Sequence, residues 1–372
     1  MIIYVCTSAE RHVVAAYFGY WGASLRKSVR LVSYKQLFSF SRLPRATYIF
    51  ADLERLPAWQ RERAALYWHH LKKTWPEARL LNHPLRTQRR YSLLRTLNKS
   101  GMNGFDVFRL EEDRTPSRFP VFIRRENSHS GPESELLHTP DELDAALRQM
   151  TERMAADDLL ITEFLNRPDP QGRFWKYSAF VFEDRIVPAH LFVEDAWCVK
   201  APMFVDDEII AAERDYIEGN PHESHLREVA RLGQIEYGRI DYGIVDGQPQ
   251  VYEINTHPQI VGAFDNHAAA RSEARERSAR LIESAFRAID DASAGKESVA
   301  PPVVAGPAWW RERSLAYGVC VALSKSIGRP SLAPWFYHQL LRLASFAMSK
   351  GLLPDAPSPD VKSQTEDRDS RH

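Results

Sequence analysis

The sequence predicts a mixed α/β (α+β) protein with both parallel and antiparallel sheet, on the strength of its length and two patterns. Its 372 residues correspond to two to three domains at about 100–200 residues per domain. In residues 1–85, short apolar runs alternate with amphipathic stretches, which is typical of a small parallel sheet connected by helices. In residues 177–193 and 237–255, pairs of apolar runs flank short polar turns, which indicates antiparallel hairpins.

The composition argues against several classes of protein. Lys plus Arg and Asp plus Glu both number 49, so the chain lacks the basic excess that is typical of a nucleic-acid-binding protein. Three widely separated cysteines form no CxxC pair, which argues against a disulfide scaffold and a structural zinc site. No basic residue precedes the first apolar run, and no run of about 18 apolar residues occurs. We therefore expect neither a signal peptide nor a membrane-spanning helix, and a cytoplasmic location.

Residues 1–85 are expected to form an N-terminal α/β domain. The stretch Ala58–Lys73 has helical spacing, with its apolar residues directed to a core. The chain contains neither GxGxxG nor GxxxxGK[ST], so it has no dinucleotide fingerprint and no P-loop. We expect this domain to be a platform rather than the nucleotide site. Strands are predicted at four apolar runs: Ile2–Val5, Val29–Ser33, Thr47–Ala51 and Arg79–Asn82.

Two further subdomains are expected at 86–165 and 166–290. The first contains a helix, a strand, a capped helix and a second strand, predicted at 88–103, Phe119–Arg125, Thr139–Met154 and Leu159–Leu165. The second contains two hairpins and two helices, predicted at Tyr177–Phe182 with Arg185–Val193, at YGRIDYGIVDGQPQVYEINTHP, at 221–235 and at 267–290.

The C-terminal part of the chain divides into three segments. Residues 291–308 have the composition of a linker, and the polar residues 354–372 are expected to be disordered. Between them, 309–353 contain two apolar helical patches. We expect a helical extension that packs on the core or on a second copy of the chain, and a peripheral membrane contact is a less favoured alternative.

The most informative group of polar residues is Arg239, Asp241, Glu253 and Asn255 in the second hairpin. Glu253 and Asn255 are two positions apart on a strand, so they share a face. Two carboxylates and an amide oxygen are hard ligands, which suits Mg²⁺ shared with substrate phosphates. Spacing alone leaves open that both carboxylates are ordinary outward-facing residues near a turn.

The metal site imposes a condition on the register of this hairpin. Asp241 and Glu253 must lie opposite each other, because only directly paired residues share a face. A two-residue turn at Asp246–Gly247 would instead pair Asp241 with Tyr252. The site therefore requires a longer loop of odd length or a β-bulge. Pro249, which has no N–H, favours the longer loop.

The segment DYGIVDGQPQVYEINTHP resembles the metal-binding hairpin of the ATP-grasp superfamily, and other motifs follow in the expected order. FPVFIRR resembles the strand with the phosphate-binding basic residue, here Arg124. LLITEFL resembles the strand whose end reads adenine, here Glu163, Phe164 and Leu165. The helix that begins at Arg90 resembles the one with the first ATP-contacting basic residue. The resemblance covers about residues 1–290.

This resemblance implies an ATP-grasp fold, in which the two α+β subdomains clamp ATP. It implies an ATP- and Mg²⁺-dependent ligase that activates a carboxylate as an acyl phosphate and joins it to an amine, with small-molecule or peptide substrates. Asp241, Glu253 and Asn255 would bind the metal, and Lys176 and Arg239 would stabilise charge in the transition state. Two alternatives stay open: a kinase that phosphorylates a hydroxyl, and a fold that binds ATP without turnover.

The chain departs from the family pattern at the phosphate site. Arg90 and Arg124 stand where lysines are usual, which keeps the charge but changes the reach. The loop NSHSG at 127–131 has one glycine where the family has a glycine-rich run. Two interpretations stay open: Ser128, His129 and Ser130 supply side-chain donors to phosphate, or the loop is a polar turn without this role. A second basic and aromatic cluster contains Arg173, Lys176, His190, Trp197 and Lys200.

Overall fold

The structure is a computed structural model, and it describes residues 1–112, 116–128, 131–152, 158–260, 269–291 and 297–302. The chain divides into two compact units, Met1–Pro302 and Val303–His372. All described residues belong to the first unit. The expected helical extension at 309–353 and the tail at 354–372 lie outside the described residues. No helix in the described ranges is long and apolar enough to cross a membrane.

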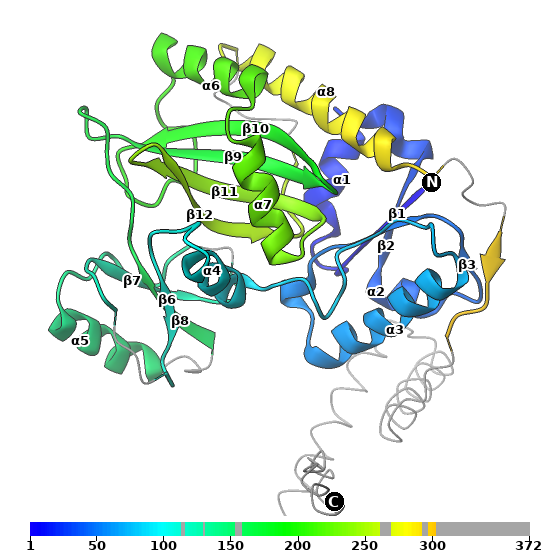
Figure 1. Ribbon diagram of the computed structural model, residues 1–372. Helices are drawn as coiled ribbons and strands as arrows, with labels where there is room; N and C mark the ends of the chain where they lie inside the picture. Colours follow the sequence, from blue (N-terminus) through cyan, green and yellow to red (C-terminus); the bar gives the residue numbers. More distant parts are fainter. Residues whose placement is uncertain (113–115, 129–130, 153–157, 261–268, 292–296, 303–372) are drawn as a thin grey trace, which may run out of the picture. The chain divides into compact units, whose positions relative to one another are not determined.

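A parallel sheet with the order β2-β1-β4-β5 lies in the N-terminal part of the chain, which was expected to be a domain (Figure 1). The central strand β1 is buried along its whole length, as expected for a parallel strand that is covered on both faces. All four predicted strands are present, as β1 (Ile2–Cys6), β2 (Val29–Ser33), β4 (Thr47–Phe50) and β5 (Leu80–Leu81). The connections contain α1 (Arg11–Gly19), α2 (Tyr34–Leu37), α3 (Ala58–Thr74) and the 3₁₀ turns η1 (Ala23–Lys27) and η2 (Leu53–Arg55).

A three-stranded antiparallel sheet follows, with the order β6-β8-β7. Its strands are β6 (Val107–Arg109), β7 (Val121–Arg125) and β8 (Leu159–Glu163), and its helices are α4 (Arg90–Lys99) and α5 (Pro140–Thr151). Helix α5 begins as predicted: the Thr139 hydroxyl accepts a hydrogen bond from the Glu142 N–H, and Pro140 occupies the first turn. Leu143 of α5 packs on Val121 and Ile161 in the core of this subdomain.

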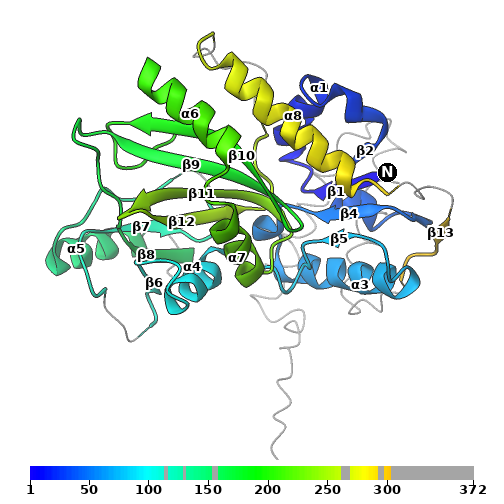
Figure 2. The same cartoon turned by 45° about the horizontal axis from the view of Figure 1, so that its top comes forward.

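The largest sheet is antiparallel and has the order β10-β9-β11-β12. Its strands confirm both predicted hairpins: β9 (Phe174–Phe182), β10 (Arg185–Glu194), β11 (Tyr237–Val245) and β12 (Gln248–Asn255). Three helices accompany it, α6 (Asp207–Gly219), α7 (Glu223–Gly233) and α8 (Ser272–Ile289), and both α6 and α8 contact the edge strand β10 (Figure 2). Tyr216 of α6 and Leu226 of α7 pack on one face, against Val181 and Ile240.

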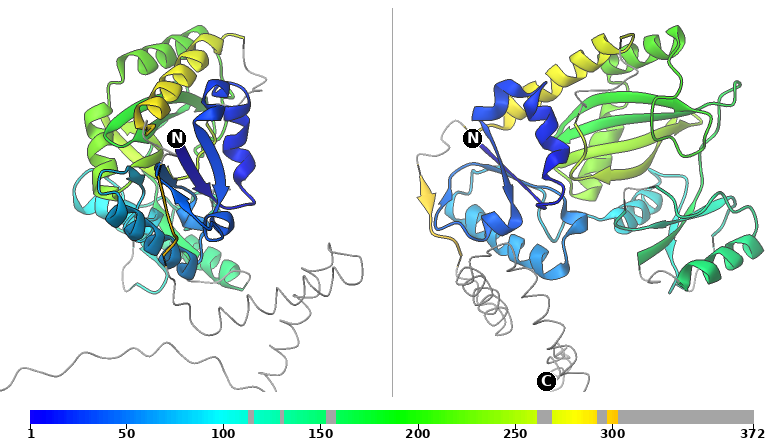
Figure 3. Two further views of the ribbon diagram at one scale, coloured as in Figure 1. Left: turned by 90° about the vertical axis from the view of Figure 1, so that its right-hand side faces the viewer. Right: turned by 180° about the vertical axis from the view of Figure 1, so that it is seen from behind.

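The helices α1 and α6 were not predicted. Helix α1 connects two parallel strands, which a tight turn cannot do. It lies beside α8, although the two helices are far apart in the sequence (Figure 3). Its Phe18 ring is 5.4 Å from Phe286 of α8, with a T-shaped geometry. These aromatic contacts join α1 to α8, which is distant in the sequence. The pattern of residues within α1 therefore does not predict them.

A short strand, β13 (Ser298–Val299), lies in the segment expected to be a linker. It pairs antiparallel with β3 (Leu43–Pro44), so that Val299 lies opposite Leu43. The chain therefore returns to the N-terminal domain after α8.

Candidate active site

Polar side chains from all four strands gather on one face of the large antiparallel sheet. Strand register places Ser178 of β9 opposite both His190 of β10 and Asp241 of β11. It also places Arg239 opposite Asn255 of β12. Since side chains alternate along each strand, these residues share the face that α6 and α7 do not cover. The face therefore brings together residues from two hairpins that the sequence analysis treated separately.

The hairpin of β11 and β12 meets the register condition for a metal site through a β-bulge. Its turn consists of Asp246 and Gly247, both with positive φ (50° and 76°), as in a type I′ turn. The regular pairing ends at Tyr242 opposite Val251. Tyr252 is then the extra residue, and Asp241 lies opposite Glu253. The two carboxylates thus share one face.

The longer loop that Pro249 was expected to favour does not form. Pro249 lies opposite Ile244, one position from the pair that closes the turn. In such a hairpin this is a non-hydrogen-bonded pair, whose N–H position points away from the partner strand. Strand β12 is also the edge of its sheet, so the missing N–H leaves no ladder bond unmade.

A first cavity of about 330 Å³, here called the central cavity, lies between the large antiparallel sheet and the three-stranded sheet. Its polar end is formed by Arg124 of β7 together with the shared face of the large sheet. Its apolar end includes Phe122, Phe164 and Trp197, whose rings lie 5.1 Å (Phe122–Trp197) and 5.5 Å (Phe164–Trp197) apart. The predicted residues that line the cavity are Arg124, Glu163, Phe164, Leu165, Lys176, Arg239, Asp241, Glu253 and Asn255.

Glu253 is bound by two arginines at the polar end of this cavity. Its Oε2 atom accepts hydrogen bonds from Nη2 of Arg90 and, at 3.1 Å, from Nη2 of Arg124. Burial, and then the neighbouring Arg90 guanidinium, lowers the pKa of Arg124 to about 10. One carboxylate therefore balances two guanidinium groups, and positive charge is in excess at the end of β7.

The carboxylate of Asp241 is also bound by neighbouring side chains. Both of its oxygens accept hydrogen bonds from Arg239, at 2.7 Å from Nε and 3.0 Å from Nη2, and Ser178 Oγ donates to Oδ1 at 2.8 Å. Bidentate pairing of this kind fixes the orientation of the carboxylate. The Asp241 side chain is 7% exposed, so it is buried together with these partners.

The three residues that were predicted to bind Mg²⁺ lie together at the polar end. Asp241 and Glu253 face each other across the ladder and are paired with arginines. Asn255 lies two positions further along β12, where its Oδ1 accepts a hydrogen bond from the His257 N–H. Within the described ranges, no cluster of three or more His, Cys, Asp or Glu side chains could hold a metal alone. A magnesium ion at such a site normally completes its shell with phosphate oxygens and water.

Glu163 has a buried carboxylate that orders the loop beside the cavity. It accepts hydrogen bonds from the Ser117 N–H at 2.7 Å, the Ser117 hydroxyl at 2.9 Å and the Asp106 N–H at 3.0 Å. The Glu163 carboxylate is thus occupied by hydrogen bonds within the protein. Residues 163–166 nevertheless line the cavity, so a ligand could contact this segment there.

Arg90 and Ser128, which were predicted to contact phosphate, do not line the central cavity. Nη1 of Arg90 donates to the carbonyl oxygens of Arg125, Glu126 and Ser128, at 3.0, 2.6 and 3.0 Å. Arg90 therefore joins the end of β7 and the following loop to Glu253. Ser130 lies outside the described residues, and the roles of Arg90, Ser128 and Ser130 toward phosphate stay predictions.

A second cavity of about 370 Å³, here called the basic cavity, shares Lys176, Lys200, Arg239 and Asn255 with the first. Sequence reasoning did not assign three arginines in its lining, because they come from separate elements. Arg55 lies in η2, whereas Arg271 and Arg275 lie at the start of α8. The four-residue spacing of Arg271 and Arg275 within a charged helix was the only local signal. Arg173, predicted in the basic cluster, lines neither cavity and pairs with Asp169.

The sequence analysis also did not predict that the loop at residues 197–200 forms a wall of the cavities. Residues 197–200 follow β10 and line the central cavity, and Lys200 borders both cavities. Glu194 fastens this loop, because its Oε1 accepts hydrogen bonds from the N–H groups of Lys200, at 2.6 Å, and Ala201. The sequence analysis selected Trp197 and Lys200 by residue type, but no spacing rule identifies an irregular loop as a wall.

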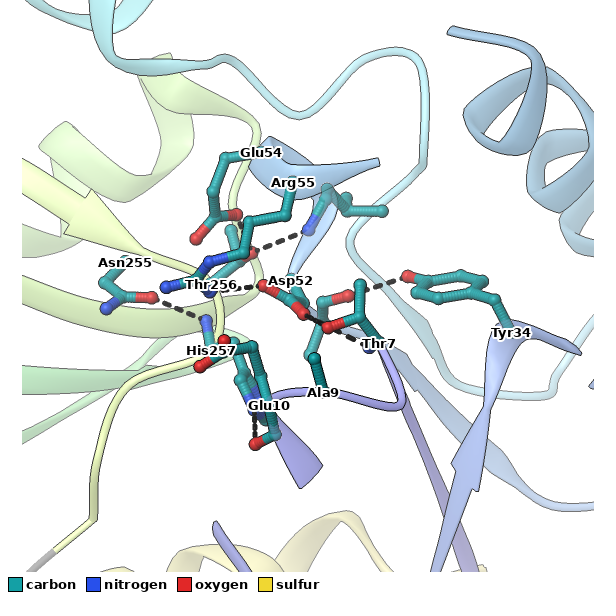
Figure 4. A network of polar contacts seen from close by, with 12 residues as sticks. Thr7, Ala9, Glu10, Tyr34, Asp52, Glu54, Arg55, Asn255, Thr256 and His257 are labelled. Atoms are coloured by element: carbon teal, nitrogen blue, oxygen red, sulfur yellow. Dashed lines mark hydrogen bonds and ion pairs between the residues drawn. The ribbon is translucent and has the colours of Figure 1, made fainter. Parts of the chain in front are cut away.

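A buried polar network fastens the end of β12 to the N-terminal domain (Figure 4). His257 donates its N–H to Asn255 Oδ1 at 2.8 Å, and its Nδ1 lies 2.9 Å from the Tyr4 hydroxyl. On the other side, Asp52 accepts hydrogen bonds from the backbone and hydroxyl of Thr7 and pairs with Arg55. The network thereby positions Asn255 and Arg55 on the walls of the two cavities.

Comparison with known proteins gives matches by structure. No family model matches the chain, and no curated protein matches it in sequence. The D-alanine–D-alanine ligase from Bacillus anthracis has 17% identity and a TM-score of 0.46, over 78% of this chain and 98% of that one. The L-amino acid ligase from Bacillus licheniformis has 12% identity and a TM-score of 0.41, over 77% and 74%.

A third similar structure is the ATP-grasp ligase PsnB, solved with a precursor variant, Mg and ADP. It has 11% identity and a TM-score of 0.42, over 76% of this chain and 97% of that one. A solved ATP-grasp ligase is thus among the structures to which this chain is similar. The mixed α/β architecture with parallel and antiparallel sheets is confirmed.

Proposed function

We propose that this protein is an ATP- and Mg²⁺-dependent ligase that activates a carboxylate and joins it to an amine. One observation carries the proposal. Three motifs that were identified separately in the sequence contribute to the lining of a single cavity: Arg124, the segment Glu163–Leu165, and the hairpin pair Asp241 and Glu253. Unrelated surface motifs have no reason to converge in this way.

In the proposed complex, the central cavity holds ATP. The apolar end around Phe122, Phe164 and Trp197 accommodates the base, since aromatic rings favour stacked or edge-on contacts with a flat heterocycle. The excess positive charge near Arg124 faces the phosphates. Asp241, Glu253 and Asn255 are the residues that would hold magnesium, which supplies charge neutralisation to the transferred phosphoryl group.

The acid substrate occupies the basic cavity in this proposal. Its carboxylate oxygen attacks the γ-phosphorus of ATP and ADP leaves, which forms an acyl phosphate. The amine then attacks the acyl carbon, inorganic phosphate leaves, and the amine loses a proton. Lys176 and Arg239 border both cavities, so they are in position to stabilise the negative charge of the group that passes between them.

The kinase alternative differs in the acceptor. A hydroxyl acceptor is neutral and gains little from a cationic wall, whereas a carboxylate is attracted to it. The second alternative, a binding module without turnover, is favoured by the pairing of both hairpin carboxylates with arginines. Against it stands the shared face that the bulge at Tyr252 creates for those carboxylates.

The deciding experiment measures ADP release with the full chain, ATP and Mg²⁺ across a panel of acids, amines and hydroxyl compounds. Mass spectrometry then identifies the product. The ligase proposal expects ADP release that requires both an acid and an amine, together with a product lighter than the two reactants by one water. A phosphorylated hydroxyl compound would instead establish the kinase, and ATP binding with no turnover across the panel would establish the binding module.

A further inference from the structure

A second β-bulge in the large antiparallel sheet directs His190 into the basic cavity. The pairing of β9 and β10 shifts between Pro188 and His190, so Ala189 is an extra residue. In an uninterrupted strand Pro188 and His190 would share a face, because they are two positions apart. The bulge instead places His190 opposite Ser178, on the face that carries the polar residues of the site, while Pro188 lies opposite Ala179 on the other face.

The two bulges of this sheet have the same consequence. The bulge at Tyr252 places Glu253 opposite Asp241, and the bulge on β10 brings His190 into the same row of the sheet, with Ser178 between His190 and Asp241. A bulge interrupts the ladder of hydrogen bonds, and bulges are frequent next to active sites, where they redirect a side chain. The position of His190 therefore points to a use for its ring at the site.

The His190 ring is held by stacking and not by hydrogen bonds. It is half-buried, lines the basic cavity and stacks on Phe192, with 4.0 Å between ring centroids and 20° between ring planes. Among the described residues, neither of its ring nitrogens has a hydrogen-bond partner. The other histidine of the lining differs: His257 has Nδ1 at 2.9 Å from the Tyr4 hydroxyl and Nε2 at 2.9 Å from the Glu10 carbonyl oxygen. The nitrogens of His190 are thus available to a ligand.

The surroundings keep this imidazole neutral and place it near the reacting group. Burial, and then Arg239, Lys176 and Arg271, hold the pKa of His190 well below its ordinary value. Arg239 and Lys176 border both cavities, so the ring lies near the boundary that the acyl group is proposed to cross. The charged residues of the surrounding elements are Lys176 of β9, Arg239 of β11, Lys200 of the loop after β10, Arg271 and Arg275 of α8, and Glu213 of α6, which pairs with Arg271.

These cations act on an amine substrate as well. Positive charge lowers the pKa of an ammonium group bound beside it, so the nucleophile is held more easily in its neutral form. A bound acyl phosphate has the opposite effect on His190, because its negative charge favours a protonated imidazole. Both effects make the transfer of a proton from the amine to His190 more favourable in the loaded site than in the empty one.

We infer that His190 accepts the proton that the amine loses during ligation. The amine nitrogen attacks the acyl carbon, a C–N bond forms, and a proton moves from that nitrogen to a ring nitrogen of His190. The bond between the acyl carbon and the phosphate oxygen then breaks, and phosphate leaves with the bonding electron pair. His190 finally releases the proton to water. This role rests on the proposed ligase function, because it requires an acyl phosphate and an amine.

The test compares two nucleophiles of different basicity. The full chain is supplied with ATP, Mg²⁺ and each acid of the panel, together with either the amines of the panel or hydroxylamine. Hydroxylamine is a weak base that is largely unprotonated at neutral pH, so its attack on an acyl phosphate depends little on a proton acceptor. In His190→Gln we expect kcat for amide formation to fall about 100-fold. Hydroxamate formation should stay close to that of the unaltered chain, because the acyl phosphate still forms.

Two further variants support the comparison. His138→Gln is the matched control, since it makes the same substitution at an exposed histidine that lines neither cavity. If His190→Gln does not fold, as thermal melting would show, His190→Ala provides a second test. It leaves space for free imidazole, which should restore part of the amide formation when added to the solution.

The outcomes separate this inference from the proposed ligase activity. Loss of amide formation with hydroxamate formation retained, in a His190 variant and not in His138→Gln, supports the inference. Unchanged amide formation, or an equal loss of both products, overturns the inference while the ligase activity stands, since an equal loss assigns His190 to substrate positioning. If the unaltered chain forms neither amide nor hydroxamate from any acid of the panel, the proposed function fails, and the inference fails with it.

Discussion

The two cavities lie on one sheet face, yet their charges are arranged in opposite ways. In the central cavity, carboxylates and arginines pair across the lining, as in Glu253 with Arg90 and Arg124. In the basic cavity, the cations line the wall and their partners, such as Glu213, lie behind it. Removing one member of a buried charge pair leaves the other member uncompensated, so a lining that contains both members depends on each of them for stability. We therefore expect substitutions in the first cavity to affect folding and chemistry together.

The largest effect is expected for Glu253→Gln. Turnover should fall about 100-fold or more, because the site loses a proposed metal ligand and its charge. The variant also leaves Arg90 and Arg124 without their carboxylate, which lowers the free energy of unfolding by about 3–5 kcal/mol.

Steady-state kinetics and thermal melting measure the two effects of Glu253→Gln separately. Glu276→Gln is the control, since it removes an exposed carboxylate that pairs with Arg280 on the surface of α8. Normal turnover in Glu253→Gln would remove the basis for the proposed metal site. Normal turnover with reduced stability would restrict Glu253 to a structural role.

Arg124→Ala should have the next largest effect, on ATP affinity. The loss of a charge-assisted contact to phosphate weakens binding by about 1.5–3 kcal/mol. Arg125→Ala is a matched control from the next position of β7, because Arg125 is 42% exposed and pairs with Glu133. Calorimetry with ATP and Mg²⁺ measures both variants. Equal affinity of Arg124→Ala and the unaltered chain would show that β7 is not the phosphate strand.

Lys176→Met tests the boundary between the two cavities. Lys176 lines both, and its Nζ donates to the Val199 carbonyl. We expect kcat to fall by about 10- to 100-fold with little change in the KM for ATP, because the charge acts on the group in transfer. Arg167→Gln, which removes an exposed charge paired with Asp246, is the control. An increase in KM alone would assign Lys176 to ground-state binding.

The smallest effect is expected on the pH dependence of folding stability, through His83, which lines neither cavity. The N–H of Leu85 donates to Nδ1 of His83, so in neutral His83 the proton is on Nε2, which lies 3.2 Å from Nε2 of His69. Burial first, and then Arg86, lowers the pKa of His83 to about 4. Between about pH 6.5 and about pH 4, the unfolded chain therefore binds a proton at His83 that the folded chain does not.

Stability should accordingly decrease as the pH falls from about 6.5 to about 4, by on the order of 2–3 kcal/mol, and be constant with respect to this group above that range. Chemical denaturation at a series of pH values measures this decrease. His83→Gln should flatten the profile in that window, while ATP affinity stays unchanged. An unchanged profile in the variant would assign the acid sensitivity to other groups.

Local sequence patterns determined much of the architecture. The strands of the parallel sheet, both hairpins and the start of α5 were predicted, because alternation, turn residues and capping side chains act over a few neighbouring residues. Helices α1 and α6 were missed. The contacts of α1 include Phe286, so its core face is defined by an element at the other end of the folded unit.

Of the candidate site, the sequence by itself determined the hairpin that holds Asp241, Glu253 and Asn255, and the condition that those residues share a face. Only the tertiary structure decided how the condition is met, through the bulge at Tyr252 rather than a longer loop. It alone also paired Glu253 with Arg90 and assembled Arg55, Arg271 and Arg275 around one cavity. The physical reason is the distance along the chain over which each feature is determined. A local pattern predicts which face of a strand or helix a residue occupies. Charge pairs and cavity walls depend on contacts between residues that are far apart in the sequence.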